Sequence, residues 1–137
     1  MKKTIIDSGP LIALFDKNDK YHKVVMAFFK DFRGEFVTSW AVITEVTHML
    51  DFNLQVQIDF LKWVEMGALS LYNIEQNELR EIIKMMSKYT NVPMDLADSS
   101  LMYIAQKEGI KNIVSIDSDF DIYRTIKKQA LNNLLRF

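Results

Sequence analysis

The chain has 137 residues and contains no cysteine, two histidines, four glycines and two prolines. The lack of cysteine excludes disulfide bonds and metal sites with thiolate ligands. With only two histidines, an imidazole-rich zinc site is also disfavoured, so a bound metal ion would take oxygen ligands, as Mg²⁺ and Mn²⁺ prefer. Nearly half of the residues are hydrophobic, and with so little glycine and proline this predicts a compact chain rich in regular structure.

No charge of one sign dominates the sequence. Lysine and arginine number 17 against 18 acidic residues, for a net charge of −1. This balance does not support a large non-specific surface for nucleic acid, although cations bound at an acidic cluster would still allow nucleic acid as a substrate. No apolar run approaches the roughly 20 residues of a membrane span, and the N-terminal sequence reaches an acidic residue too early for a signal peptide. We therefore expect a cytoplasmic protein with no membrane association.

Short apolar, β-branched runs alternate with amphipathic segments along the chain. The runs predict strands at 3–6, 36–38, 69–74, 113–116 and 131–137. The amphipathic segments predict helices at 8–16, 22–32, 40–52, 54–66, 75–89 and 95–108, with a turn or short helix at 124–129. This alternation predicts an α/β fold with a mostly parallel, twisted sheet covered by helices on both faces. The length fits one domain over residues 1–137.

Four acidic residues stand where a ligand site of such a fold is expected. Asp7 and Asp117 each follow an apolar strand, and the carboxyl ends of parallel strands face the ligand crevice. Glu45 and Asp98 lie on the apolar stripes of predicted helices. Four carboxylates in one crevice repel one another, and one or two divalent cations relieve this repulsion. Such a cluster suits the attack of water on a phosphodiester.

Each acid also has a purely structural explanation. Asp7 could be a turn residue, and Asp117 lies where a strand runs into a loop. Asp95 could cap the helix that it begins, and Asp98 would be favoured in the first turn by the helix dipole. Glu45 is the hardest to explain in this way, because acids in the middle of a helix usually face solvent. The agreement of four such positions favours a functional site.

Four segments resemble the PIN-domain ribonuclease family, especially the VapC-type toxins of bacterial and archaeal toxin–antitoxin pairs. They follow one another in the family's order along essentially the whole chain, and the last two are the most specific. These segments are IDSGPL at 6–11, WAVITEV at 40–46, PMDLADSSL at 93–101 and SIDSDF at 115–120. The resemblance implies a single PIN-like domain and a divalent-metal-dependent endoribonuclease.

The resemblance also implies roles for the acids. Asp7 and Asp98 would be the principal ligands of Mg²⁺ or Mn²⁺, and Glu45 and Asp117 would complete the shell directly or through water. Ser115 stands where the family has threonine or serine, and it would orient a ligand or a water molecule.

Further residues are candidates for supporting roles. Asp95 and Asp119 are supporting acids by the resemblance, although we favour Asp95 as a helix cap. Asp119 is closer to Asp117 than in some family members, which leaves open which of the two contacts the metal; we favour Asp117. Phosphate contacts are expected from Arg124, Lys127 and Lys128. The alternative is that these residues form a solvated charged turn.

The expected partners also come from the resemblance. They are an RNA substrate, a small cognate antitoxin and a second copy of the chain. The helices at 22–32 and 54–66 are rich in aromatic residues and methionines. Most of these are expected in the core, and any surplus is a candidate for these protein contacts. Two other classes stay open on the residues alone: a receiver-type phosphoacceptor domain and a catalytically silent binding module.

Overall fold

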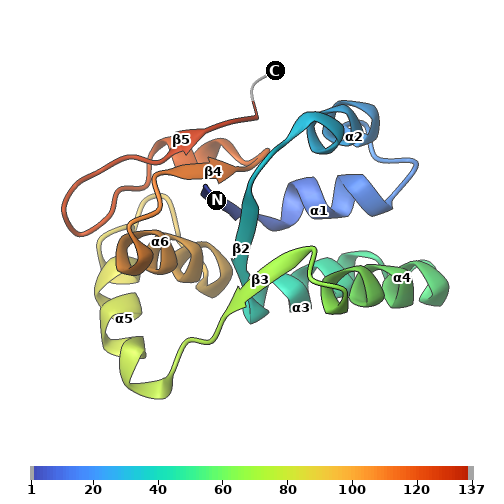
Figure 1. The fold of residues 1–137 in the computed structure, drawn as a ribbon. Coiled ribbons are helices and arrows are strands. Elements are labelled where there is room, and N and C mark those ends of the chain that lie inside the picture. Colours follow the sequence, from blue (N-terminus) through green and yellow to red (C-terminus); the bar gives the residue numbers. More distant parts are fainter. Residues whose placement is uncertain (1, 136–137) are drawn as a thin grey trace.

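A computed structural model describes residues 2–135. Its five strands form one sheet in the order β3-β2-β1-β4-β5, with every neighbouring pair parallel (Figure 1). The strands are β1 (Lys3–Ile6), β2 (Glu35–Ser39), β3 (Leu69–Tyr72), β4 (Asn112–Val114) and β5 (Asn132–Asn133). This order differs from the 2-1-3-4-5 order of receiver-type domains. The receiver alternative is therefore excluded, and the predicted α/β class with a parallel sheet is confirmed.

Helices connect the strands and cover both faces of the sheet. They are α1 (Ser8–Phe15), α2 (His22–Asp31), α3 (Trp40–Met49), α4 (Leu54–Glu65), α5 (Leu79–Ser87) and α6 (Leu96–Glu108). In Figure 1, α5 and α6 lie on one side of β2, and α1 to α4 lie on the other. Right-handed crossovers explain this division, because the chain first builds outward from β1 to β3 and then returns past β1 to β4. In the described residues, none of these helices is long and apolar enough to cross a bilayer.

The two central strands fix the position of the site. Ile5 pairs with Ile113 and Ile6 with Val114, and all four side chains are fully buried. Strands buried on both faces are expected to be continuously apolar, as these are. The register brings the ends of β1 and β4 level, and the backbone N–H of Asp7 donates to the carbonyl of Val114 at 3.1 Å.

The connections from β1 and β4 leave the sheet in opposite directions. The strand order reverses between these two neighbours, because β2 and β3 lie to one side and β5 to the other. In open parallel sheets, such a switch point forms a crevice at the carboxyl ends of the strands. The residues that follow β1 and β4 therefore line the expected ligand crevice.

Several predicted boundaries were wrong. The helix predicted at 40–52 ends at Met49, and the helix predicted at 75–89 consists of a 3₁₀ turn, Gln76–Glu78, followed by α5. The strands predicted at 69–74 and 113–116 end at Tyr72 and Val114. The segment 124–129, predicted as a turn or a short helix, forms a turn. These ends are set by side-chain caps and turns, which the spacing of hydrophobic residues does not reveal.

The predicted last strand, 131–137, was also too long. Only Asn132–Asn133 pairs with β4, and residues 136 and 137 lie outside the described part of the chain. Asparagine is a poor strand former whose side chain competes for backbone hydrogen bonds. Asn133 does so here, since its side-chain oxygen accepts from the backbone N–H of Leu135 at 3.1 Å.

Candidate metal centre

Asp7 lies at the bottom of the crevice, directly after β1. It is 4 % exposed and is the N-cap residue of α1. The pKa of Asp7 is raised from 3.8 to about 6, mainly by burial and to a smaller extent by the negative charges of Glu45 and Asp117. Hydrogen bonds from the backbone of Ser8 and the side chain of Ser115 oppose this shift. The carboxylate is thus held in a position where ionisation is costly unless a cation is near.

Ser115 follows β4 and connects two of the acids. It is 1 % exposed, and its hydroxyl donates to Oδ2 of Asp7 at 3.1 Å. The same Oγ accepts the backbone N–H of Asp117 at 3.0 Å. Ser115 therefore orients Asp7 and fixes the start of the loop that carries Asp117, in line with its predicted orienting role.

Asp98 reaches the crevice from the first turn of α6. Asp95 caps this helix as predicted, because its Oδ1 accepts the backbone N–H of Asp98 at 2.8 Å. The side chain of Asp98 is half-buried at the edge of the apolar stripe that Leu101 and Met102 continue into the core. Its pKa is raised to about 8, first by burial and then by Asp95, Asp7 and the remaining acids of the crevice.

Asp117 enters from the loop after β4, and Asp119 turns away. Oδ1 of Asp117 accepts the backbone N–H of Asp119 at 2.9 Å, which caps the 3₁₀ turn Ser118–Asp121. Asp117 lines the crevice, whereas Asp119 is not among the lining residues. The turn thus orients the first acid toward the other carboxylates.

The three aspartates form a compact cluster. One carboxylate oxygen each of Asp7, Asp98 and Asp117 lies within 4.8 Å of the other two. They belong to a cavity of about 290 Å³, which Glu45 and Asp95 also line. Glu45 is half-buried in the middle of α3 and contributes no oxygen to the group of three. The four acids of the predicted quartet therefore share one cavity, with three of them close together.

No protein cation neutralises these charges in the part of the chain that the structure describes. Within residues 2–135, the ion pair present joins Lys84 and Glu81 on α5, and no lysine or arginine nitrogen lies within 4.0 Å of the quartet. Three carboxylate oxygens at this spacing, without a basic partner, match the hard oxygen ligands that Mg²⁺ and Mn²⁺ take. The donor set fits a divalent cation.

The predicted phosphate contacts lie on the loop beyond Asp117, outside the cavity. Arg124 donates through Nη1 to the carbonyl oxygens of Asp121 at 2.7 Å and Tyr123 at 2.9 Å. Lys127 and Lys128 are exposed. None of the three cations lines the cavity. The backbone N–H of the neighbouring Ile126 donates to Oε1 of Gln106 near the C-terminal end of α6, so Lys127 and Lys128 lie toward the opposite end of that helix from Asp98.

Two residues in the surroundings of the site carried no sequence signal. The hydroxyl of the fully buried Tyr123 donates to the carbonyl of Pro93 at 3.1 Å and approaches Oδ2 of Asp98 at 3.4 Å. The side chain of Asn133 contacts the backbone of Ser115. Both contacts join segments 18 or more residues apart, and neither residue belongs to a periodic pattern.

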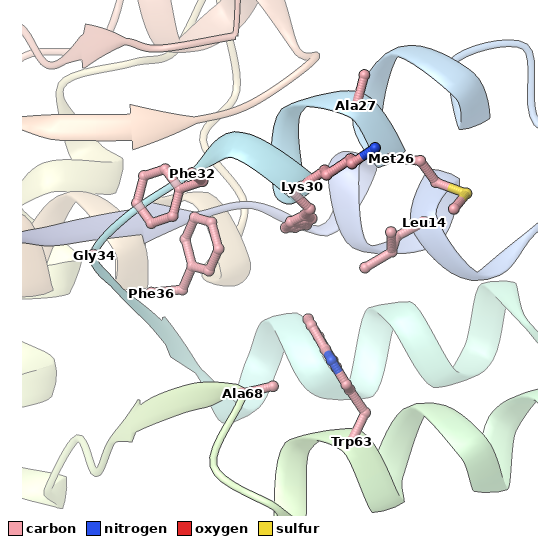
Figure 2. Close-up of a pocket in the computed structure, with 10 residues that line it drawn as sticks. Leu14, Met26, Ala27, Lys30, Phe32, Gly34, Phe36, Trp63 and Ala68 are labelled. Carbon is pink, nitrogen blue, oxygen red and sulfur yellow. The ribbon is translucent and has the colours of Figure 1, made fainter.

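A second hollow lies away from the acids, among α1, α2, α4 and the start of β2 (Figure 2). It has a volume of about 660 Å³ and mostly apolar walls. Phe32 and Phe36 stack at one end, with ring centroids 4.3 Å apart. Trp63 rises from α4 toward Leu14 and Lys30 in Figure 2. Exposed apolar grooves of this kind are typical of protein docking sites.

The geometry of the site agrees with the comparison to known proteins. The family model of the PIN domain matches residues 4–125, a span that holds all four acids. The chain belongs to the PIN domain family. Among curated PIN-like relatives, ribonuclease VapC26 of Mycobacterium tuberculosis is 24 % identical over 115 residues, which cover 82 % of this chain and 85 % of that protein.

Solved structures show the same fold. VapC20 of Mycobacterium tuberculosis, described as a sarcin–ricin loop cleaving toxin, superposes with a TM-score of 0.78 at 14 % identity over 87 % of this chain and 93 % of that one. A toxin–antitoxin complex from Klebsiella pneumoniae gives a TM-score of 0.63 at 14 % identity, covering 84 % and 87 %. VapBC2 of Rickettsia felis, bound to promoter DNA, gives 0.62 at 11 % identity, covering 96 % and 98 %. The predicted PIN-like architecture is confirmed.

Proposed function

We propose that this PIN-domain chain is a divalent-metal-dependent endoribonuclease and the toxin of a toxin–antitoxin pair. The observation that carries the proposal is the cluster of Asp7, Asp98 and Asp117, whose oxygens lie within 4.8 Å of one another with no basic side chain against them. The similarity to a curated VapC ribonuclease supports it. A silent binding module would have no need for three carboxylates held at this cost.

The residues would divide the work as follows. Asp7, Asp98 and Asp117 would hold Mg²⁺ or Mn²⁺ directly. Glu45, which lines the same cavity outside the group of three, would act through a water molecule. Ser115 would keep the carboxylate of Asp7 aimed at the cation through its 3.1 Å hydrogen bond.

When bound, the divalent cation lowers the pKa of water and stabilises the charge that develops on the leaving oxygen of the phosphodiester. The chain itself supplies the positions. Asp7 is fixed by the end of β1 and by Ser115, and Asp98 by the capped first turn of α6. Glu45 would accept a proton or orient water. This cluster needs no histidine, in agreement with a sequence that has only two.

RNA is the proposed substrate because the named relatives act on it. The curated relative is called a ribonuclease, and the solved toxin VapC20 is described as cleaving the sarcin–ricin loop. Lys127 and Lys128 are exposed on the loop that follows Asp117, and we propose that they contact RNA phosphates at some distance from the cleaved bond. Arg124 would contribute mainly by holding that loop through its two bonds to backbone carbonyls.

We further propose that one domain over residues 1–137 acts in the cytoplasm as a homodimer that an antitoxin neutralises. Two of the matched folds come from toxin–antitoxin complexes. The groove of Figure 2, with apolar walls and Lys30 among its lining residues, would accept an apolar antitoxin segment that carries an acidic side chain. Trp63→Ala would then weaken antitoxin binding while leaving metal binding unchanged.

The test is cleavage of a labelled RNA by purified, metal-free protein. We expect cleavage with added Mg²⁺ or Mn²⁺ and none in excess EDTA. The variants Asp7→Asn and Asp98→Asn keep the shape of the side chain and remove the charge, so they should reduce cleavage by about 10²-fold or more. The matched control Asp59→Asn, on the exposed face of α4, should cleave normally. Cleavage that persists in excess EDTA, or in a variant that combines Asp7→Asn with Asp98→Asn, would falsify the proposal.

A further inference from the structure

The backbone ladder between β4 and β5 ends at Ile113, four residues before Asp117 of the acidic cluster. Backbone bonds from Asn132 to Lys111, at 2.8 Å, and from Leu134 to Ile113, at 2.9 Å, form this ladder. The next residue along the chain whose backbone N–H and carbonyl face β5 is Ser115, directly after β4. No backbone of the two-residue strand β5 reaches it, and buried peptide groups require partners.

The side chain of Asn133 supplies both missing partners. Its Oδ1 accepts the backbone N–H of Ser115 at 3.2 Å, and its Nδ2 donates to the carbonyl of Ser115 at 2.9 Å. The same Oδ1 accepts the N–H of Leu135 at 3.1 Å, which fixes the amide from its own strand. A side-chain amide with both groups engaged fixes the two peptide units on either side of the Ser115 Cα atom, much as the backbone of another strand residue would.

The residue held in this way controls two of the three clustered acids. The hydroxyl of Ser115 is bonded to Oδ2 of Asp7 at 3.1 Å and to the N–H of Asp117 at 3.0 Å. A rotation of the Ser115 backbone would shift its hydroxyl and would also move the loop that carries Asp117. Contacts of this kind outside the ligand shell typically change metal affinity by about 10–100-fold.

We propose that Asn133 is a positioning residue of the metal centre, which acts through Ser115 to hold Asp7 and Asp117 in the arrangement that binds a divalent cation. The inference rests on the proposed function. It makes β5, which contributes no ligand, a part of the site.

Titration calorimetry of metal-free protein with Mn²⁺ tests this directly. Asn133→Ala should weaken Mn²⁺ binding about 10-fold. The matched control is Asn132→Ala, because the neighbouring side chain also bridges β5 and β4, through Nδ2 to Oδ1 of Asn112 at 3.2 Å, but does not contact Ser115. This control should bind Mn²⁺ within about twofold of the unchanged protein, even where both variants lose similar thermal stability.

Kinetics with RNA give a second readout. The ligands themselves are intact in Asn133→Ala, so saturating Mn²⁺ should restore kcat, and the KM for RNA should stay unchanged at every metal concentration. Because metal binding also stabilises a partly unfolded variant, circular dichroism of the metal-free Asn133→Ala protein should first show that it is folded. Should Asn133→Ala fail to fold, Asn133→Asp replaces it, since it keeps the acceptor for Ser115 N–H and puts a charged oxygen, which repels the Ser115 carbonyl, in place of the donor.

The outcomes separate the two proposals. Failure of the unchanged protein to bind Mn²⁺ would overturn the proposed function and this inference with it. Normal Mn²⁺ binding by the unchanged protein and by the folded Asn133 variant would overturn the inference alone. An equal loss of affinity in the Asn132 and Asn133 variants would also overturn it, because the effect would then come from the strand pairing in general.

Discussion

The hydroxyl of Ser115 lies 3.1 Å from Oδ2 of Asp7 and joins the ends of the two central strands. These residues are 108 positions apart in the chain, yet the register of β1 and β4 brings them level. The bond lowers the pKa of a carboxyl group that burial raises. The strand pairing therefore makes the deepest acid of the crevice easier to ionise than burial alone would allow.

Ser115→Ala should weaken metal binding in a pH-dependent way. Without the hydroxyl, the pKa of Asp7 rises above about 6, so more of the protein carries a proton that the cation must displace. A hydrogen bond to a charged group is worth about 1.5–3 kcal/mol, which predicts roughly a tenfold loss of Mn²⁺ affinity at pH 6–7. The loss should shrink near pH 9, when calorimetry is repeated across pH.

Ser115→Thr is the control for this prediction, because it keeps the hydroxyl. It should bind Mn²⁺ nearly as the unchanged protein does. A loss of affinity in Ser115→Ala that is the same at pH 6 and at pH 9 would show that the hydroxyl does not act through the ionisation of Asp7.

The metal-free protein should become less stable as the pH rises. The pKa of Asp98 is about 8 and that of Asp7 about 6, against 3.8 for an exposed aspartate. Between pH 4 and pH 8 the folded state thus binds protons that the unfolded state has released, and stability falls with pH. The cost is absent below pH 4 and is complete once the pH has passed both folded-state values.

Asp98→Asn removes the larger of these two pKa shifts. In EDTA at pH 8.5 we expect this variant to melt roughly 3–8 °C above the unchanged protein, for a gain of about 1–2 kcal/mol, and the two should converge at pH 4. Mn²⁺ should raise the Tm of the unchanged protein only. A metal-free protein that melts higher at pH 8.5 than its Asp98→Asn variant would contradict the repulsion described here.

Asp117 and Asp119 should differ sharply when each is changed to asparagine. Asp117 belongs to the cluster, so Asp117→Asn should weaken Mn²⁺ binding by about 10–100-fold, as is typical of a damaged metal site. An asparagine at this position still offers an oxygen to the N–H of Asp119, so the turn is kept. Asp119→Asn should change the affinity by less than about threefold. A larger loss of Mn²⁺ affinity in Asp119→Asn than in Asp117→Asn, measured by calorimetry, would show that Asp119 is the ligand.

The charges on the loop after Asp117 should affect RNA binding and not metal binding. Lys127→Ala combined with Lys128→Asn removes two positive charges, and asparagine tolerates the left-handed φ of 62° at position 128. We expect a higher KM for RNA and a salt dependence of binding reduced by about 0.7 per lost phosphate contact. Lys84→Ala on α5 is the control, and an equal effect of all these changes would point to non-specific attraction.

The site could be predicted from the sequence to the extent that it depends on local position. Asp7 follows an apolar strand, and Asp98 lies in the first turn of a helix that Asp95 begins; both placements follow from neighbours in the chain. The structure places both acids in one cavity together with Glu45 and Asp117. The sequence thus predicted each acid from its position in a strand or helix, whereas the parallel topology of the sheet brings those strands and helices together.

The supporting contacts were not predictable, because they depend on long-range register. Asn133 lies in a segment predicted as a continuous strand. The neighbouring sequence does not indicate that its side chain, in place of a strand backbone, bonds to the backbone of Ser115. Tyr123 lies in an irregular segment, and only the fold brings its hydroxyl near Asp98. The apolar stripe of α3 was likewise an imperfect guide to burial, since Met49, four residues after Glu45 on that stripe, is 54 % exposed.

Anomalous diffraction from crystals soaked in Mn²⁺ above pH 8 would locate the cation itself. The clustered carboxylates of Asp7, Asp98 and Asp117 predict a strong anomalous peak in contact with all three, which disappears in crystals of Asp98→Asn treated identically. A map with no peak in the crevice, while the unchanged protein still cleaves RNA, would show that these acids do not hold the catalytic metal.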